Sequence, residues 1–287
     1  MKRLLWLAAA LTLLAACAPK AQEPKVMARE VPERADDFVF ENNLIAGRFY
    51  GKALEGNPTS PGLDIWVKLP GRLVANEWYA KAVSEDGNYY HHDHGGKDCY
   101  KVAVSLGGGA SVPFIDSTLC WPATNYRSAE VISQTADEVV FALHYPEWEA
   151  AEGIRVALDK KVTVKADSYF IAVEDSYTFS GVERLPVAAG MKLHGDLATV
   201  QETLLSDARD RWAIWEKASD TGAEPEDGLL GVAVILPGAE SALTTQDHAL
   251  LLKTVASGEP LRYCVGSCWS KGDIKTAAAW FELVKGL

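Results

Sequence analysis

Apolar and polar residues alternate over short stretches along most of the chain from Phe38 onward, which is the pattern of half-buried β-strands. Turn residues separate these stretches. The Asn-rich turn between Phe38–Asn43 and Leu44–Tyr50 predicts one hairpin, and Thr135–Asp137 predicts a second. The remaining pattern predicts strands over Leu63–Lys68, Ala129–Gln134, Glu138–Tyr145, Lys161–Lys165, Tyr169–Phe179, Leu185–Leu193, Arg211–Lys217, Leu229–Leu236, Ala249–Val255 and Leu261–Val265.

Helical periodicity is found only at the C-terminal end, where Trp280, Phe281 and Val284 of Thr276–Lys285 lie on one stripe. The chain has no internal repeat and no sharp change in composition. We therefore predict a single all-β domain over residues 37–287. Its expected fold is a large antiparallel β-sandwich, galactose-mutarotase-like or super-sandwich in type, with a short C-terminal helix. Sandwiches of this length recur among bacterial carbohydrate enzymes, but a fold does not determine a function.

The N-terminus has the features of a secretory signal. Lys2 and Arg3 precede an apolar run that is too short to span a bilayer, and the run ends in Leu-Ala-Ala-Cys at Cys17. This ending is similar to the bacterial lipobox, so we expect residues 1–17 to hold a lipoprotein signal with Cys17 as the lipidated residue. Residues 18–36 are then expected to form a flexible tether. The predicted location is the outer membrane of a Gram-negative bacterium, facing the periplasm or the cell surface.

The net charge of the chain limits the kinds of molecule that it is expected to bind. The formal net charge is −11, and removal of Lys2 and Arg3 with the signal makes it two units more negative. This excess of acidic groups argues against nucleic acid as a partner. An acidic oligosaccharide would require a local cluster of Lys, Arg or His to overcome the general repulsion.

Four cysteines remain besides Cys17. In an oxidising compartment they could form two disulfides, and proximity favours Cys99 with Cys120 and Cys264 with Cys268. The spacing of Cys264 and Cys268 also fits a zinc site, but no second pair of ligands stands close by in the sequence.

The richest chemical stretch is YYHHDHGGKDCYKV, residues 89–102, which holds half of the six histidines of the chain. In an extended conformation His92 and His94 would share one face, and His91 and Asp93 the other. Two imidazoles on one face suit a transition metal that takes a third ligand from His144 or His194. A divalent metal is therefore possible, although the leading hypothesis below needs no cofactor.

The same stretch also suits proton transfer without a metal. A neutral imidazole can accept a proton near pH 7, and a Tyr hydroxyl or a Lys ammonium can donate one. A positive group on the substrate carboxylate would stabilise the carbanion of an elimination, and Lys97, Lys101 or Arg127 could supply it. A third interpretation is a plain solvated loop. The candidate catalytic residues are His91, His94, Tyr90, Tyr100 and Lys101.

Other segments add candidates for substrate binding. Trp148 and Trp269 neighbour ionisable residues and could stack on sugar rings, although most tryptophans of a sandwich are core residues. His194 ends an apolar strand and is either a site residue or a structural histidine. Gly107–Gly109 lacks the rest of a phosphate loop and is interpreted as a flexible turn beside a site. No GxSxG stretch supports a hydrolase of the nucleophile-elbow type.

Taken together, these motifs resemble a bacterial family catalogued as domain of unknown function four-eight-six-one, from about Phe38 to the C-terminus. Tyr90, His91, Asp93, His94 and Gly95 match its Tyr-His-x-x-His-Gly core, and Tyr100 and Lys101 match its Tyr-Lys pair. His92 stands where the family more often has an acidic residue. The segments that carry the resemblance are FVFENNLIAGRFYG, LDIWVK, YHHDHGGKDCYKV, SLGGGA, HYPEW, AAGMKLH and WSKGDIKT.

The resemblance implies an envelope protein of a polysaccharide-degrading bacterium, with a dehydratase role on unsaturated uronyl ends of oligosaccharides. The leading hypothesis is therefore a lipid-anchored lyase or dehydratase. In it His91 or His94 is the base, Tyr90 or Tyr100 the acid, Lys101 or Arg127 the carboxylate ligand, and Trp269 a stacking residue. The alternatives are a non-catalytic glycan-binding lipoprotein and a metal-dependent glycan hydrolase.

Overall fold

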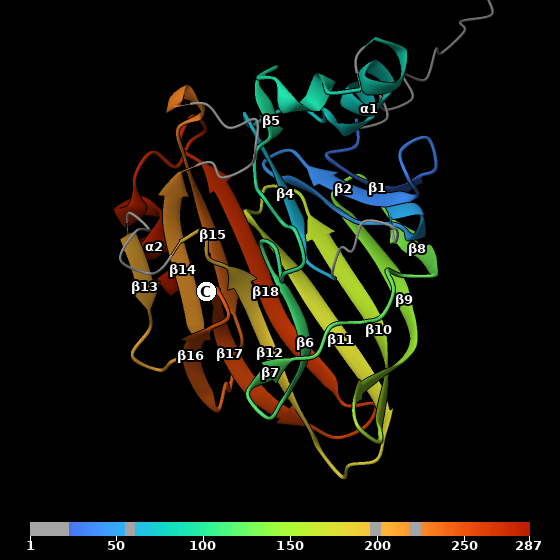
Figure 1. Ribbon diagram of the computed structural model, residues 1–287. Helices are drawn as coiled ribbons and strands as arrows, with labels where there is room; N and C mark the ends of the chain where they lie inside the picture. Colours follow the sequence, from blue (N-terminus) through green and yellow to red (C-terminus); the bar gives the residue numbers. More distant parts are fainter. Residues whose placement is uncertain (1–22, 55–60, 86, 196–201, 218–224) are drawn as a thin grey trace, which may run out of the picture.

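A computed structural model describes residues 23–54, 61–85, 87–195, 202–217 and 225–287. The predicted signal and Cys17 lie outside the described residues. The described strands form three antiparallel sheets, of five, eight and five strands (Figure 1). The predicted all-β antiparallel sandwich with a short C-terminal helix is confirmed. No helix in the described part of the chain is long and apolar enough to cross a membrane.

The first sheet has the order β1-β2-β3-β4-β5. Its strands are β1 (Val26–Val31), β2 (Asp37–Asn42), β3 (Ala46–Phe49), β4 (Asp64–Lys68) and β5 (Gly96–Asp98). The predicted hairpin of β2 and β3 is confirmed. The predicted tether is wrong in part, because residues 26–31 pair along their whole length with β2. Val26 and Val31 are fully buried there, which a flexible linker would not allow.

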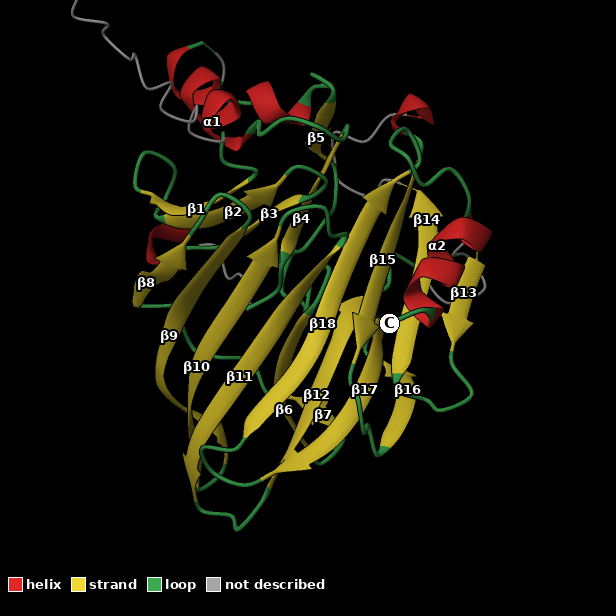
Figure 2. Ribbon diagram, turned by 180° about the vertical axis from the view of Figure 1, so that it is seen from behind, coloured by secondary structure: helices red, strands yellow, loops and turns green. Residues whose placement is uncertain are grey.

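The eight-stranded sheet has the order β13-β14-β15-β18-β11-β10-β9-β8. The view from behind shows this sheet along its length (Figure 2). Its strands are β8 (Ser128–Gln134), β9 (Glu138–Ala151), β10 (Ile154–Lys165), β11 (Phe170–Ser180), β13 (Glu202–Leu205), β14 (Arg211–Lys217), β15 (Leu229–Ile235) and β18 (Pro260–Trp269).

The third sheet has the order β16-β17-β12-β6-β7. Its strands are β6 (Ala110–Ile115), β7 (Thr118–Leu119), β12 (Leu185–Lys192), β16 (Ser241–Thr245) and β17 (His248–Val255). All three sheets contribute to one main core cluster, which includes Phe40 of β2, Phe141 of β9 and Val187 of β12. The first and third sheets therefore share the inner face of the eight-stranded sheet as their packing partner.

Two α-helices cover the outer faces. Helix α2 (Ala277–Lys285) packs through Trp280 on the outside of the eight-stranded sheet (Figure 2). Helix α1 (Ala75–Ser84) packs through Trp78 and Tyr79 on the outside of the first sheet. Three single-turn 3-10 helices, η1 (Lys52–Leu54), η2 (Tyr89–His91) and η3 (Pro225–Asp227), lie in connections. The expectation that only the C-terminus is helical is thus wrong.

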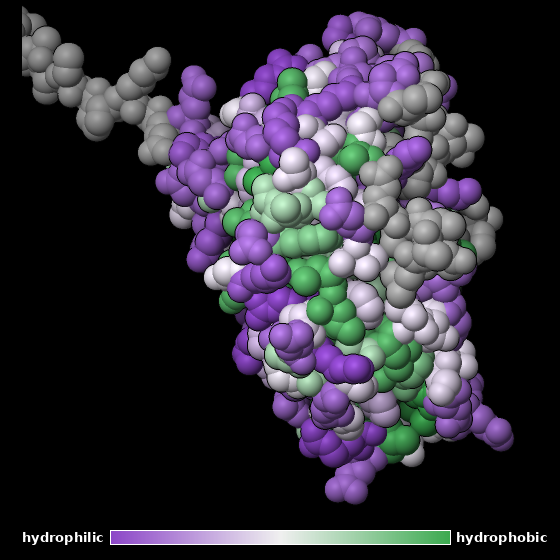
Figure 3. Space-filling view, turned by 90° about the vertical axis from the view of Figure 1, so that its left-hand side faces the viewer, coloured by the Kyte–Doolittle hydropathy of each residue, from purple (hydrophilic) through white to green (hydrophobic). Residues whose placement is uncertain are grey.

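The side of the molecule where the eight-stranded sheet and the third sheet end is less polar than its surroundings. β13 and β16 are the edge strands there. Figure 3 shows a band of apolar residues down this side, with hydrophilic residues along its left flank. The hydrophobic interior of the sandwich thus comes close to the surface where the two sheets end.

The cysteine predictions are wrong. Neither predicted pair is linked, and the four described cysteines form no disulfide. Cys264 and Cys268 lie four residues apart on β18, so about 13 Å separates them along the strand, whereas a disulfide requires Cα atoms within about 7 Å. Cys99 follows β5 of the first sheet and Cys120 follows β7 of the third.

The Gly107–Gly109 turn is tightly packed, contrary to the flexible turn that we predicted. Gly107 has a φ of 55°, and a Cβ placed there would lie 2.3 Å from the carbonyl oxygen of Leu63. A Cβ on Gly108 would lie 2.0 Å from Cδ1 of Ile65. These glycines allow the segment after β5 to lie directly against the strand that leads into β4.

Candidate functional site

The histidine-rich stretch is not extended, contrary to our expectation. Residues 89–91 form η2, because the Tyr90 ring is buried in a stack on Trp66 with ring centroids 5.1 Å apart. The Tyr90 hydroxyl accepts a hydrogen bond from Nε of Arg34 at 3.1 Å. The alternation of faces that grouped His92 with His94 therefore does not occur. Tyr90 is a structural residue here, and its burial keeps its hydroxyl from serving as an acid for a substrate.

Beneath this turn a buried arginine on β3 joins its own strand to three others of the first sheet. Arg48 donates from Nε to Oδ2 of Asp64 and from Nη2 to Oδ2 of Asp98, both at 2.8 Å. Its Nη1 lies 3.5 Å from Oδ2 of Asp37. Burial raises the pKa of Asp37 to about 6, because the guanidinium groups of Arg48 and Arg34 offset only part of the desolvation.

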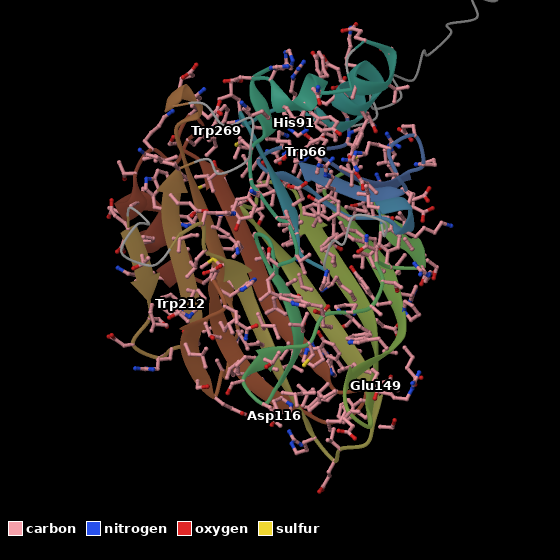
Figure 4. The ribbon with its side chains drawn as sticks, viewed as in Figure 1. Trp66, His91, Asp116, Glu149, Trp212 and Trp269 are labelled. Atoms are coloured by element: carbon pink, nitrogen blue, oxygen red, sulfur yellow. The ribbon has the colours of Figure 1, made fainter. Side chains whose placement is uncertain are left out.

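His91 connects this cluster to the surface. It lies at the top of the molecule above Trp66 (Figure 4), and its side chain is 30% exposed. Its Nδ1 lies 3.9 Å from Oδ2 of Asp98. The imidazole is thus partly exposed and lies near a buried carboxylate that Arg48 holds, at a distance longer than a hydrogen bond.

The other histidines of the stretch do not form a metal site. His94 stacks on the ring of Tyr89, with centroids 3.9 Å apart. Asp93 accepts hydrogen bonds from the amides of Gly95 and Gly96 and pairs with Nζ of Lys271 at 2.8 Å. Within the described ranges no group of three or more His, Cys, Asp or Glu side chains is arranged to hold a metal ion.

His144 is one of the two residues, with His194, that we suggested as a third metal ligand, but its ring pairs with a residue outside the histidine-rich stretch. It lies on β9, where its Nδ1 is 2.6 Å from Oδ1 of Asp159 on the neighbouring strand β10. The two residues are directly opposite each other in the register of the hairpin. The histidines at 92 and 94 therefore do not meet His144 as a ligand set.

A recess of about 350 Å³ lies where the segment after β5 meets the ends of β12 and the start of β17. It brings together two of our predicted residues, Lys101 and His194. The residues that line it are Lys101, Val102, Ala103, Lys192, Leu193, His194, Gly195 and Asp247.

Backbone hydrogen bonds hold the walls of this recess in place. The amide of Lys192 donates to the carbonyl of Gly107, and the amide of Leu193 donates to the carbonyl of Asp247, at 2.8 and 2.7 Å. The buried hydroxyl of Tyr100 contacts the carbonyls of Gly107 and Lys192 at 3.1 and 3.3 Å. Burial raises the pKa of Tyr100 far above its usual value. Tyr100 therefore supports the recess, and the predicted role as a proton donor does not fit its burial.

His194 is held at both ring nitrogens. Its Nδ1 lies 2.8 Å from Oε1 of Glu216 on β14, and its Nε2 lies 2.7 Å from the carbonyl oxygen of Lys101. The ring also packs edge-on against Tyr100, with centroids 4.7 Å apart. This histidine, which the sequence left open as a site or structural residue, thus forms part of the recess wall.

The charges around the recess are mostly positive. Lys101 is exposed, and the half-buried Lys192 points its Nζ to within 3.5 Å of Oδ2 of Asp247, whose side chain is 74% exposed. Asp247 can be expected to screen Lys192 only weakly, because it is itself largely hydrated. The recess is therefore a candidate binding site for an anionic group.

His248 lies behind the recess as a neutral structural residue. Its Nδ1 donates to the carbonyl of Gln246, and its Nε2 accepts from the amide of Leu106 at 3.1 Å. Burial lowers its pKa to about 4. Its ring also contacts that of Trp121.

The two tryptophans that we expected to stack on sugars are buried. Trp148 is a member of the main core. Trp269 ends β18, donates from its indole nitrogen to the carbonyl of Asp227 at 2.6 Å and lies beneath Nζ of Lys271. Neither presents a ring to solvent, because each is at most 4% exposed. Arg127 is exposed just before β8 and is not among the residues that line the recess.

The sequence interpretation missed Lys192, Glu216 and Asp247. Lys192 and His194 stand two positions apart at the end of an apolar strand, so alternation places them on one face, and this pattern could have revealed the pair. Glu216 closes the apolar strand β14 in the same way. The link between Glu216 and His194 joins two different sheets and has no local signature.

Comparison with known proteins gives one family and two individual similarities. A family model described as "Domain of unknown function (DUF4861)" matches residues 15–287. A protein of Formosa agariphila described as "Uncharacterized protein P7" is 28% identical over 275 residues, which are 90% of this chain. The chain spans 65% of the length of that relative.

The sandwich is also similar to part of a solved glycosidase structure, the GH36 α-galactosidase AgaB from Geobacillus stearothermophilus. The match covers 85% of this chain and 41% of that one, at 11% identity and a TM-score of 0.40.

Proposed function

This chain belongs to the DUF4861 family, and from that premise we propose that it is a carbohydrate-active lyase or dehydratase that acts on uronate-containing oligosaccharides. The observation that carries the proposal is the cationic recess formed by Lys101, Lys192 and His194. It lies on a protein whose formal net charge is −11. Local concentration of positive charge against such a background fits an acidic ligand.

The chemistry of a uronic acid fits this arrangement. A base removes the proton on the carbon next to the carboxylate, a carbon–carbon double bond forms, and the oxygen on the following carbon leaves with its bonding electrons. Cations at the carboxylate stabilise the negative charge that develops there. We assign Lys192 and His194 to the carboxylate for this reason.

The proton transfers are assigned to His91 and Lys101. His91 is preferred to His94 as the base, because the partly exposed His91 ring lies 3.9 Å from the buried carboxylate of Asp98, whereas the ring of His94 is stacked on Tyr89. Lys101, three residues after Asp98, then protonates the leaving oxygen, which departs as water or as a sugar hydroxyl. Tyr90 and Tyr100 are set aside as acids because both are buried.

Incubation with oligosaccharides that carry both an unsaturated uronyl end and saturated uronate residues, followed by mass spectrometry, tests this proposal. The saturated residues are required because only they keep the proton next to the carboxylate that the base removes. We expect products that have lost the mass of one water or have gained a new double bond at a cleaved linkage. Lys101→Met should reduce kcat by about 10²–10⁴-fold. Lys161→Met should leave it unchanged, since Lys161 pairs with Glu174 on the other side of the eight-stranded sheet.

Saturable binding without any product, in wild type and variants alike, would contradict catalysis and support a glycan-binding lipoprotein. The envelope location is proposed with the same function. Cys17→Ala should release the protein from the membrane fraction of the producing cell, whereas continued membrane association of this variant would refute a lipid anchor at Cys17.

A further inference from the structure

We infer that Glu216 holds His194 as an imidazolium, so that His194 serves the recess as a fixed positive charge and neither donates nor accepts a proton in the reaction. The inference deepens the proposed function, on which it rests only for the identity of the anion as a uronate carboxylate. Glu216 is therefore a positioning residue that acts through His194.

The hydrogen-bond partners of the ring support this protonation state. The carbonyl oxygen of Lys101, 2.7 Å from Nε2, can only accept, so Nε2 carries a proton. Oε1 of Glu216 lies 2.8 Å from Nδ1. A bare Nδ1 facing an ionised carboxylate would place two lone pairs against each other, so one proton must lie between these atoms.

The position of that proton follows from the basicity of the two groups. An ordinary imidazole is more basic than an ordinary carboxylate by about two pKa units. The proton between Nδ1 and Oε1 therefore belongs to the ring, and the contact is an ion pair between an imidazolium and a carboxylate. Both side chains are largely buried, with 11% and 4% exposed, so solvent screens this pair little.

Other groups near His194 modify this charge. Lys192 of the same segment and Lys101 of the facing segment are cations, and the nearby His248 is neutral at pH 7. Asp247 at the start of β17 supplies one exposed negative charge. Tyr100 packs on the ring as a neutral phenol. Glu216 is thus the buried anion in direct contact with the ring.

His194 and the lysine side chains of the recess would interact with the ligand in different ways. Because both N–H groups of His194 are used within the protein, the ring contributes charge to the recess but no hydrogen bond. A direct hydrogen bond to a carboxylate would come from the ammonium group of Lys192, while Lys101 is left to the leaving oxygen. The recess then suits a single anionic group such as the carboxylate of a uronic acid ring.

The first test measures the protonation of His194 in the wild-type protein. Nitrogen-15 NMR of histidine-labelled protein at pH 7, assigned with His194→Gln, should show both ring nitrogens protonated for His194. One protonated and one bare nitrogen would overturn the inference. This result depends on no substrate and no reaction.

The second test uses Glu216→Gln and the binding of glucuronate at two pH values. At pH 7.5 the variant loses the positive charge on the recess wall together with the negative charge behind it. We expect binding to be a few-fold weaker than wild type, because His194 lines the recess and Glu216 does not. At pH 5.5 an ordinary histidine is protonated, and the affinity should reach or exceed that of wild type because no carboxylate then faces the ring. A purely structural defect would weaken binding equally at both pH values, and that outcome would refute the inference.

A matched control is Glu282→Gln, which removes a carboxylate from an exposed ion pair with Lys285 on α2. It should bind glucuronate as wild type does at both pH values. If no elimination product is ever found but the NMR and pH results hold, the proposed reaction fails while the fixed charge at His194 stands. If NMR shows a neutral His194 but the elimination product forms normally, the inference about His194 fails while the proposed reaction stands.

Discussion

Glu216 lies on β14 of the eight-stranded sheet and His194 follows β12 of the third sheet, and the 2.8 Å contact between Oε1 and Nδ1 joins these two layers of the sandwich at the edge of the recess. His194 and Glu216 are 22 positions apart in the sequence, and their contact has the third sheet on one side and the eight-stranded sheet on the other. Anything that separates the layers at this point would therefore also change the charge of the recess.

Asp247 should weaken anion binding, because its carboxylate lies 3.5 Å from Nζ of Lys192. Asp247→Asn removes this competing charge, and we expect glucuronate to bind about two- to fivefold more tightly, with a steeper dependence on salt. Calorimetric titration measures both. The control is Glu149→Gln, an exposed position on β9 of the eight-stranded sheet (Figure 4). An equal gain in that control, or no gain at position 247, would contradict the assignment of the recess.

Arg48 should be essential for stability, because its removal leaves Asp64 and Asp98 buried without their cation. We expect Arg48→Met to lower the free energy of unfolding by about 3–5 kcal/mol. Urea denaturation checks this value. Arg155→Met, which breaks an exposed pair with Glu147, should change it by no more than about 0.5 kcal/mol. A small effect at position 48 would mean that the carboxylates find other partners.

His248 should make the protein sensitive to acid. Its folded-state pKa of about 4 lies below the ordinary 6.5, so the unfolded chain takes up the proton first as the pH falls. The neutral, buried form of His248 stabilises the fold fully above pH 6.5. As the pH falls from 6.5 to 4, the free energy of unfolding decreases by roughly 3 kcal/mol for this reason. The variant His248→Gln has no titrating group at this position and therefore lacks this pH-dependent contribution to stability. The stability advantage of wild type over the variant should shrink over that interval, and a constant difference would disprove the cause.

Reducing agents should not affect the fold, because the described cysteines form no disulfide. We expect the same Tm with and without dithiothreitol, and four reactive thiols after unfolding besides Cys17, whose thiol lipidation would block. A fall in Tm of several degrees on reduction would show that a bridge exists.

The strands could be predicted because their pattern is local. Alternation of apolar and polar residues identified β2, β3, β14 and β15 closely, and the cap of α2 is provided locally by Thr276. Helix α1 could not be predicted in this way. Its N-terminus has no side-chain cap of its own, and Glu41 of β2 instead accepts from the amides of Val74 and Ala75. That partner is more than 30 residues away.

The site was predictable only in part for a similar reason. Lys101 and His194 were identified as chemically suitable residues, but the recess that joins them depends on long-range pairing between β12, β17 and the segment after β5. Tyr90, Tyr100, Trp148 and Trp269 were equally suitable by residue type. Burial, which a local pattern does not reveal for a single aromatic residue, assigned them to the interior.

The position of β18 has a consequence for how the chain is made. This strand, residues 260–269, lies between β15 and β11 and is the only connection in the described sheet between its two halves. During synthesis or export, β8–β11 and β13–β15 can each form early, but the eight-stranded sheet cannot close until residues 260–269 have emerged. Folding should therefore be a late, slow event in which both halves expose unpaired edges, and a chaperone that covers these edges would raise the yield.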